Sequence, residues 1–196
     1  MSTIDNITFD DTIYSRGNHS ALILHQKDES NRSISLPNAQ LMTFLQPFKD
    51  MILCQNYIKN KEEEEQQQQQ RRHEFTLFAY SENIYTWLWN NNVIPQNLNN
   101  ITIFCLSDND KKFLTDWARR YTQRVKEVIT CDKLERELLF FGMKFIEKMR
   151  SEYHDDEGIL NLLDADHTRL RLALMYSLME DVNRLDNDPR MGVQPA

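Results

Sequence analysis

The sequence predicts an α/β fold: a five-stranded, mostly parallel, doubly wound sheet followed by a C-terminal helical extension. Short apolar runs of strand character alternate along the 196 residues with segments whose apolar residues recur at helical spacing. The runs are continuously apolar, which indicates strands that are covered on both faces, as in a parallel sheet. Beyond residue 132 the helical spacing continues with no further strand-like run.

The N-terminal part has the weakest pattern. Residues 1–19 are polar without a sustained period, so we expect a flexible N-terminal arm. Residues 21–25, Ala-Leu-Ile-Leu-His, form the first predicted strand. Apolar residues over 41–48 recur at helical spacing behind a possible capping residue, Ser35, and predict a helix. Residues 51–53, Met-Ile-Leu, are interpreted as a second short strand that leads into a further helix.

The middle of the chain contains a low-complexity insert and then the clearest pattern. Residues 61–72 read KEEEEQQQQQRR and have no apolar side to bury. This insert predicts either a solvated helix extension or a disordered loop. Residues 75–80 and 101–106 then predict two strands rich in aromatic and β-branched residues, and residues 83–91 predict the helix between them.

A weaker strand at 125–129 completes the predicted sheet, after a helix whose start is capped within residues 107–110. Five strands with right-handed crossovers give a Rossmann-like domain of the flavodoxin-like or receiver-like type over residues 20–135. Residues 136–187 predict a C-terminal helical hairpin across an acidic turn, and residues 188–196 predict a disordered tail.

The composition excludes several classes of function. Only four glycines occur, where about fourteen are usual at this length, so neither a P-loop nor a dinucleotide fingerprint can be written and no cofactor is expected. The net charge of −7 and the scattered basic residues argue against a nucleic-acid partner. No apolar run approaches the roughly 18 residues that span a membrane. Three dispersed cysteines predict free thiols in a cytoplasmic protein.

One stretch carries a resemblance. Residues 99–106, Asn-Asn-Ile-Thr-Ile-Phe-Cys-Leu, are followed by Trp117 in a predicted helix and by Val-Lys-Glu-Val-Ile at 125–129. This order resembles the N-terminal α/β domain of bdelloid rotifer multidomain proteins, over about residues 20–150. The family pattern is a strand that ends in Tyr/Phe-Cys, a polar turn, a Trp-containing helix and a Lys-x-Val-Phe strand. The resemblance implies accompanying modules, often tetratricopeptide repeats, and assigns no activity.

Five polar residues are candidates for a ligand crevice, because ligands of a doubly wound sheet bind outside the carboxyl ends of the strands. They are His25 after the first strand, Ser81 and Glu82 after the third, and Ser107 and Asp108 after the fourth. The third strand ends without the aspartate of a phosphoacceptor receiver. Ser107 and Asp108 are also explained as helix caps, and Glu82 matches the acid of an NAD-cleaving TIR-like pocket by position alone.

No catalytic or metal-ligating motif is found. The acid and histidine groups at 154–157 and 164–167 lack the spacing of a calcium loop, and are interpreted as a solvated turn and a helix N-terminus. Trp87 and Trp89 lie two residues apart on a predicted helix and cannot face the same core, so Trp89 is a partner-surface candidate. Phe140, on the first helix of the hairpin, is another.

Two functions remain as hypotheses. The first is a non-catalytic intracellular protein-interaction or regulatory module, with an unidentified protein partner or an additional domain. The alternative is a small-molecule or nucleotide-binding domain, including an NAD-processing TIR-like domain, that uses the strand-end crevice. The long apolar stripes after residue 132 also lead us to expect that deletion of 159–196 exposes apolar surface while the core domain still folds.

Overall fold

The computed structural model describes residues 2–25, 34–68, 72–91 and 94–186. Its contacts divide the chain into two compact units, residues 1–135 and residues 136–196. Helix α4 (Cys131–Glu152) begins in the first unit and continues into the second.

The first unit is built on a five-stranded sheet in which every neighbouring pair of strands is parallel. The strands are β1 (His19–Leu24), β2 (Leu45–Phe48), β3 (Glu74–Tyr80), β4 (Leu98–Cys105) and β5 (Val125–Thr130). Their order across the sheet is β2-β1-β3-β4-β5, which is the doubly wound order of flavodoxin-like folds. The predicted five-stranded α/β architecture is therefore confirmed, and the sheet is entirely parallel.

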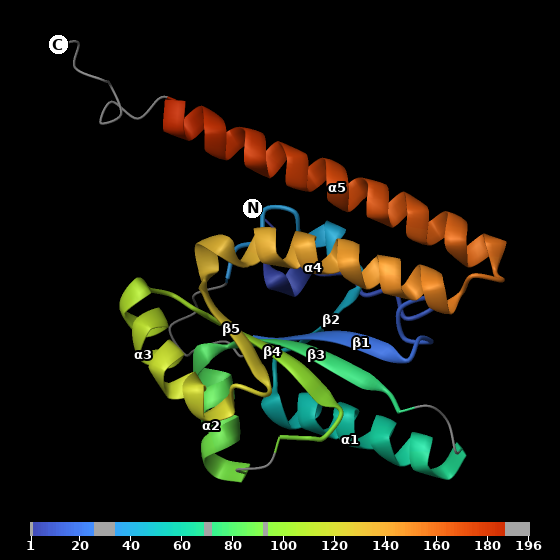
Figure 1. Ribbon diagram of the computed structural model, residues 1–196, viewed down its shortest axis with the longest axis horizontal. Coiled ribbons are helices and arrows are strands. Elements are labelled where there is room, and N and C mark those ends of the chain that lie inside the picture. Colours follow the sequence, from blue (N-terminus) through green and yellow to red (C-terminus); the bar gives the residue numbers. More distant parts are fainter. Residues whose placement is uncertain (1, 26–33, 69–71, 92–93, 187–196) are drawn as a thin grey trace. The chain divides into compact units, whose positions relative to one another are not determined.

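Helices lie on both sides of this sheet (Figure 1). One face carries α1 (Met51–Gln68), α2 (Ser81–Asn91) and α3 (Asp108–Ala118), the last followed by the 3-10 helix η3 (Arg119–Tyr121). The other face carries two 3-10 helices, η1 (Ile4–Asn6) and η2 (Ala39–Leu41). Helical turns of the first unit therefore lie on both faces of the sheet.

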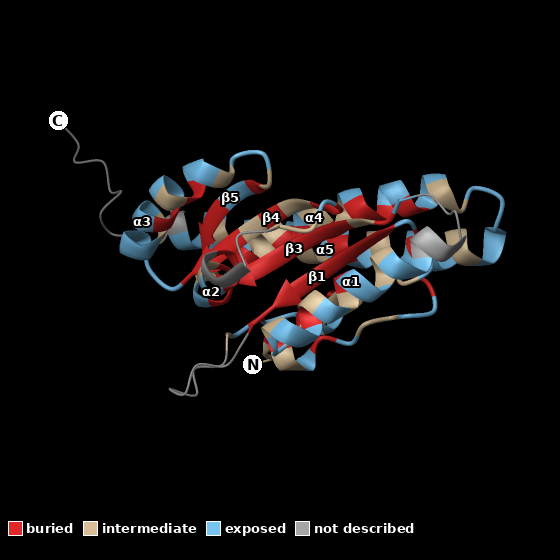
Figure 2. Cartoon of the chain, turned by 90° about the horizontal axis from the view of Figure 1, so that it is seen from below, coloured by how far each residue is buried: buried red, intermediate tan, exposed pale blue. Residues whose placement is uncertain are grey.

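Strands β1 and β3, at the centre of the sheet, are buried almost throughout, as their continuous apolar sequences predict. Every residue of β1 is buried, and so is every residue of β3 after Glu74 (Figure 2). Leu22 and Leu77 are paired in the register and belong to the core beneath α1, α2 and α3. Because side chains alternate along a strand, their neighbours Ile23 and Phe78 point to the opposite face. Both of these are also buried.

Residues 2–18 are packed into the first unit, so the prediction of a flexible arm is wrong. Ile4 and Tyr14 are each only 1 % exposed. The Ile4 amide donates to the Ile34 carbonyl at 3.2 Å, which fixes this segment to the connection between β1 and β2. The Tyr14 ring meets the Phe44 ring edge-on, with 6.5 Å between centroids. The apolar residues responsible are few and irregularly spaced, so they produce no period in the sequence.

The predicted helix over 41–48 and the predicted strand over 51–53 are both wrong. Residues 45–48 form β2 at the edge of the sheet, and residue 51 begins α1. Pro47 accounts for the difference, because a proline disrupts the interior of a helix but is accepted on an edge strand, where one side needs no amide donor.

The first residues of the Glu/Gln-rich insert continue α1 as a helix, which is the first of the two predicted alternatives. The helix ends at Gln68, and residues 69–71 lie outside the described residues. Lys61 pairs with Glu64 at 3.0 Å on this solvated turn. Exposed pairs on a helix contribute only about 0.3–0.5 kcal/mol each, so they favour the helix weakly.

The second unit is an antiparallel hairpin of α5 (Glu157–Asp186) and the part of α4 from Arg136 onward. Arg136 on α4 pairs with Asp181 on α5 at 2.9 Å, and Arg150 pairs with Asp164 at 3.0 Å nearer the turn. The Asp156 carboxylate accepts an amide hydrogen bond from the first turn of α5 and caps that helix. This arrangement matches the predicted hairpin across an acidic turn. The predicted tail, 188–196, lies outside the described residues.

The apolar stripe predicted on the last helix is only partly buried. Leu170 and Leu174 are buried, whereas Leu178 and Val182 are 41 % and 55 % exposed. Successive steps of four residues rotate by about 40° around a helix of 3.6 residues per turn. By Val182 the row has therefore turned well away from Leu170. Among the helices described, none is long and apolar enough to cross a membrane.

Candidate functional site

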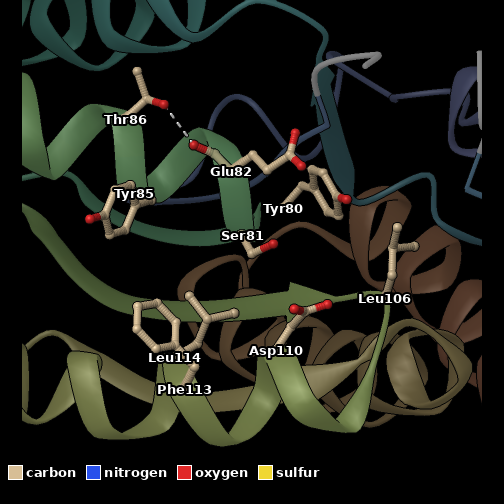
Figure 3. A pocket seen from close by; sticks show the side chains of 9 residues that line it. All are labelled: Tyr80, Ser81, Glu82, Tyr85, Thr86, Leu106, Asp110, Phe113 and Leu114. Carbon is tan, nitrogen blue, oxygen red and sulfur yellow. Dashed lines mark hydrogen bonds between the residues drawn. The ribbon is translucent and has the colours of Figure 1, made fainter. Parts of the chain in front are cut away.

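A cavity of about 500 Å³ opens at the carboxyl ends of β3 and β4, between the beginnings of α2 and α3 (Figure 3). This is the edge of the sheet at which the sequence predicts a ligand crevice. The lining residues are Tyr80, Ser81, Glu82, Tyr85, Thr86, Leu106, Asp110, Phe113 and Leu114. Two of the five predicted crevice residues, Ser81 and Glu82, are therefore brought together at the cavity.

Ser107 caps α3 and does not line the cavity. Its hydroxyl oxygen accepts from the Asp110 amide at 3.1 Å, and its hydroxyl donates to the Asp110 carboxylate at 2.6 Å. These bonds hold the Asp110 side chain, which lies among the lining residues (Figure 3). Asp108 is exposed in the first turn of α3, where a carboxylate interacts favourably with the helix dipole. Ser107 therefore has the capping role that the sequence also allowed, and Asp108 follows it in the first turn of the helix.

His25 follows β1 and lies apart from the lining. It is 5 % exposed, and its backbone amide donates to the Phe48 carbonyl at 2.8 Å, which extends the contact between β1 and β2. The structure thus places this predicted crevice residue in the interior. The cavity is confined to the ends of β3 and β4.

The two tyrosines that line the cavity contact further aromatic rings, all in tilted arrangements. The Tyr85 ring lies 5.4 Å from the Trp117 ring, and Trp117 lies 5.1 Å from Tyr121. Trp117 packs against the core while remaining half-buried. The Tyr80 ring lies 5.8 Å from Phe104, which is fully buried in β4. These contacts restrict the motion of the two tyrosine side chains. A ligand that binds to them therefore costs little additional side-chain entropy.

Sequence reasoning missed the apolar and aromatic part of this lining. It considered polar residues at the strand ends, whereas Tyr85 and Phe113 lie a helical turn further along α2 and α3. The spacing of four between Ser81 and Tyr85, and of three between Asp110 and Phe113, would place each pair on one side of its helix. This spacing was the feature of the sequence that could have identified Tyr85 and Phe113 as lining residues.

The lining places polar groups that can bind a ligand beside apolar side chains. The lining residues supply hydroxyls, two carboxylates and apolar groups, but no imidazole, thiol, amine or guanidinium. The Thr86 hydroxyl donates to the Glu82 carbonyl at 2.9 Å, and the Asp110 carboxylate accepts from Ser107.

A serine and a histidine do meet elsewhere, at the amino ends of β1 and β3. The Ser20 hydroxyl and His73 Nε2 are 2.8 Å apart, and His19 Nε2 lies 2.9 Å from the Thr76 hydroxyl. Ser20 and His73 are 1 % and 7 % exposed, so a substrate has no access to this pair. The bonds satisfy buried polar groups between neighbouring strands.

The three cysteines are free thiols, as predicted. Burial raises the pKa of Cys54 to about 12 and that of Cys131 to about 12, and burial also raises the pKa of Cys105. The thiolate is the reactive form, so these groups are poor nucleophiles near neutral pH. Among the described residues, no group of three or more His, Cys, Asp or Glu side chains could hold a metal ion.

The two predicted partner-surface residues have different outcomes. The Trp89 side chain lies outside the described parts, whereas its neighbour Trp87 is 2 % exposed and belongs to the core. Phe140 on α4 is 38 % exposed. Its role in partner binding stays a prediction.

No family model matches this sequence, and no curated protein and no solved structure is significantly similar to it. The resemblance to the rotifer domain therefore also stays a prediction.

Proposed function

We propose that this protein is a non-catalytic interaction module, and that its helical hairpin pairs with a second copy of the chain through α5. The observation that carries the proposal is a row of exposed apolar side chains along that helix. Leu172, Met175, Tyr176, Met179 and Val182 are between 45 % and 66 % exposed. An extended apolar surface of this kind on a folded protein is typical of an interaction site.

The spacing of this row fits a seam between two helices. Leu172 and Met179 are seven residues apart, and Met175 and Val182 repeat the same interval three residues later. These are the a and d positions of successive heptads. Leu170 and Leu174, elsewhere on α5, are already buried. A helix that is apolar on more than one side is stabilised when a second element packs against its remaining exposed apolar side.

The charges beside the row favour parallel pairing. In a parallel pair, a g position of one helix lies next to the e position of the following heptad of the other. With Leu172 at position a, this brings Asp164 of one copy near Arg169 of the second, which gives opposite charges. It likewise brings Arg171 near the ring of Tyr176, a favourable contact for a cation.

The energies predict a weak dimer. Full burial of an apolar side chain contributes about 1.5–3 kcal/mol. About half of each side chain is exposed, so the five residues of each of two copies contribute about 8–15 kcal/mol in total. Association itself costs about 4–15 kcal/mol in lost motion. Because the two terms are similar, we expect concentration-dependent pairing and not a permanent dimer.

Sedimentation equilibrium of the full chain tests this proposal. We expect the mass to rise from 23.4 kDa towards twice that value as the concentration increases. Met175→Glu combined with Met179→Glu places charges in the seam and should keep the chain monomeric, while circular dichroism shows unchanged helix content. Thr115→Glu, at an exposed position on α3, adds charge outside the seam and should pair like the original chain.

Two outcomes would contradict the proposal. One is a chain that stays monomeric at every concentration while its helix content matches the structure. The other is a doubly substituted chain that pairs as strongly as the Thr115→Glu control.

A further inference from the structure

We infer that the cavity between α2 and α3 binds the guanidinium group of an arginine side chain on a protein segment. This binding site is separate from the α5 seam and is independent of pairing between copies. It would give the first unit a recognition function of its own. The inference rests on the charge of the lining, on its aromatic rings and on the exposure of its rim.

The charge of the lining selects a cation. Glu82 and Asp110 contribute two carboxylates, and no basic side chain is among the nine lining residues. The amino ends of α2 and α3 oppose this charge, each equivalent to about half a positive charge. The two carboxylates outweigh the two helix ends by about one negative charge. A phosphate-bearing ligand such as a nucleotide is therefore disfavoured, and an organic cation is favoured.

The rings select a flat cation. Tyr80, Tyr85 and Phe113 all line the cavity (Figure 3). A guanidinium is planar, stacks on aromatic faces and donates two parallel hydrogen bonds to one carboxylate. The ammonium group of lysine is not planar, and its N–H donors are not arranged in a parallel pair. The combination of a carboxylate with aromatic faces therefore fits arginine better than lysine.

The rim indicates that the cation comes from a protein segment. Leu106 and Phe113 line the cavity and are 51 % and 62 % exposed, so its edge offers apolar contacts at the surface. An arginine side chain has an apolar stem that packs on such groups while its charged end reaches inward. The residues flanking the arginine in a peptide would cover the exposed Leu106 and Phe113, whereas free arginine would leave much of that surface in water.

An NMR titration of the ¹⁵N-labelled full chain tests the inference. The probe is the peptide acetyl-Gly-Leu-Arg-Leu-Gly-amide, and the matched control peptide carries citrulline, which keeps the shape of arginine without its charge. A lysine peptide and free arginine are the remaining arms. We expect saturable shifts of the amides of residues 80–86 and 106–114 with the arginine peptide. The citrulline peptide should bind at least tenfold more weakly, with lysine between the two.

Protein variants locate the interaction. Glu82→Gln removes one lining carboxylate and Phe113→Ala removes one exposed ring, and each should weaken binding of the arginine peptide about tenfold. Asp116→Asn removes a carboxylate from the exposed side of α3 and should leave the affinity unchanged. The spectra of the variants report whether each remains folded, and both substituted lining side chains are exposed.

Several results would overturn the inference. These are no saturable shifts with the arginine peptide, shifts centred on other residues, or equal binding of the citrulline peptide. Free arginine binding as tightly as the peptide would refute a protein segment as the ligand. A loss of affinity in Asp116→Asn as large as in Glu82→Gln would show that only the general negative charge matters.

Discussion

Replacement of Tyr14 by alanine measures whether the N-terminal residues belong to the folded core. Tyr14 is 1 % exposed and meets Phe44 edge-on. A buried aromatic side chain removes about 150–250 Å² from water. At about 25 cal/mol per Å² this is an upper value of about 4–6 kcal/mol. A compact unfolded chain lowers the value by about 10–40 %, so we expect Tyr14→Ala to reduce the free energy of unfolding by about 2–5 kcal/mol.

Urea denaturation followed by tryptophan fluorescence is the assay. All three tryptophans, at positions 87, 89 and 117, belong to the first unit, so the signal reports that unit. With a slope of about 1–3 kcal/mol per molar urea, the midpoint should fall by about 1–5 M. Arg16→Ala, at an exposed neighbouring position, should change stability by less than about 0.5 kcal/mol. A change of that small size in Tyr14→Ala would refute the packed N-terminal segment.

Four further predictions concern the helix cap, the reactivity and titration of the thiols, and the hairpin. Ser107→Ala removes the cap of α3 and should cost about 1 kcal/mol in urea denaturation, and an unchanged midpoint would argue against the cap. Cys54 and Cys131 should react slowly with a thiol reagent at pH 8 until urea is added, and rapid labelling of the folded chain would contradict their raised pKa. Because burial raises these pKa values, the folded state holds the protons more tightly, so stability should fall as the pH rises from about 9 towards 12. Deletion of 159–196 should increase the binding of an apolar dye while the fluorescence of residues 1–135 stays native, and a soluble truncated chain without dye binding would contradict this.

Strands β1, β3 and the second half of β4 could be predicted from sequence because a strand covered on both faces is a continuous apolar run. Strand β5 shows a weaker pattern, because its Lys126 and Glu127 are exposed. The fifth, β2, is short and lies at the edge, so its four residues carry too few apolar groups to show a strand pattern. The neighbouring apolar residues produced a helical spacing by coincidence. Pro47 was the local signal against that helix. The packing of Tyr14 depends on contacts with residues distant in the sequence, and no local pattern reveals such contacts.

The sequence predicted where the cavity lies in the fold, but only some of the residues that line it. The rule that ligands bind at the carboxyl ends of parallel strands located the end of β3 correctly, and with it Ser81 and Glu82. It could not separate residues that line a cavity from residues that cap a helix, because Ser107 and Asp110 follow the same strand and differ only in orientation. Phe113 is exposed on α3, and its apolar character gave no polar signal to follow.

Disulfide formation between copies tests pairing through α5 most directly. Met179→Cys places a thiol in the seam, where the two copies of this position face each other in a parallel pair. The native thiols of Cys54 and Cys131, with pKa values of about 12, compete little. With oxidised glutathione, we predict that Met179→Cys forms a linked dimer much faster than Thr115→Cys, whose thiol is exposed on α3. Equal rates for the two variants, or no linked dimer from Met179→Cys, would contradict pairing through α5.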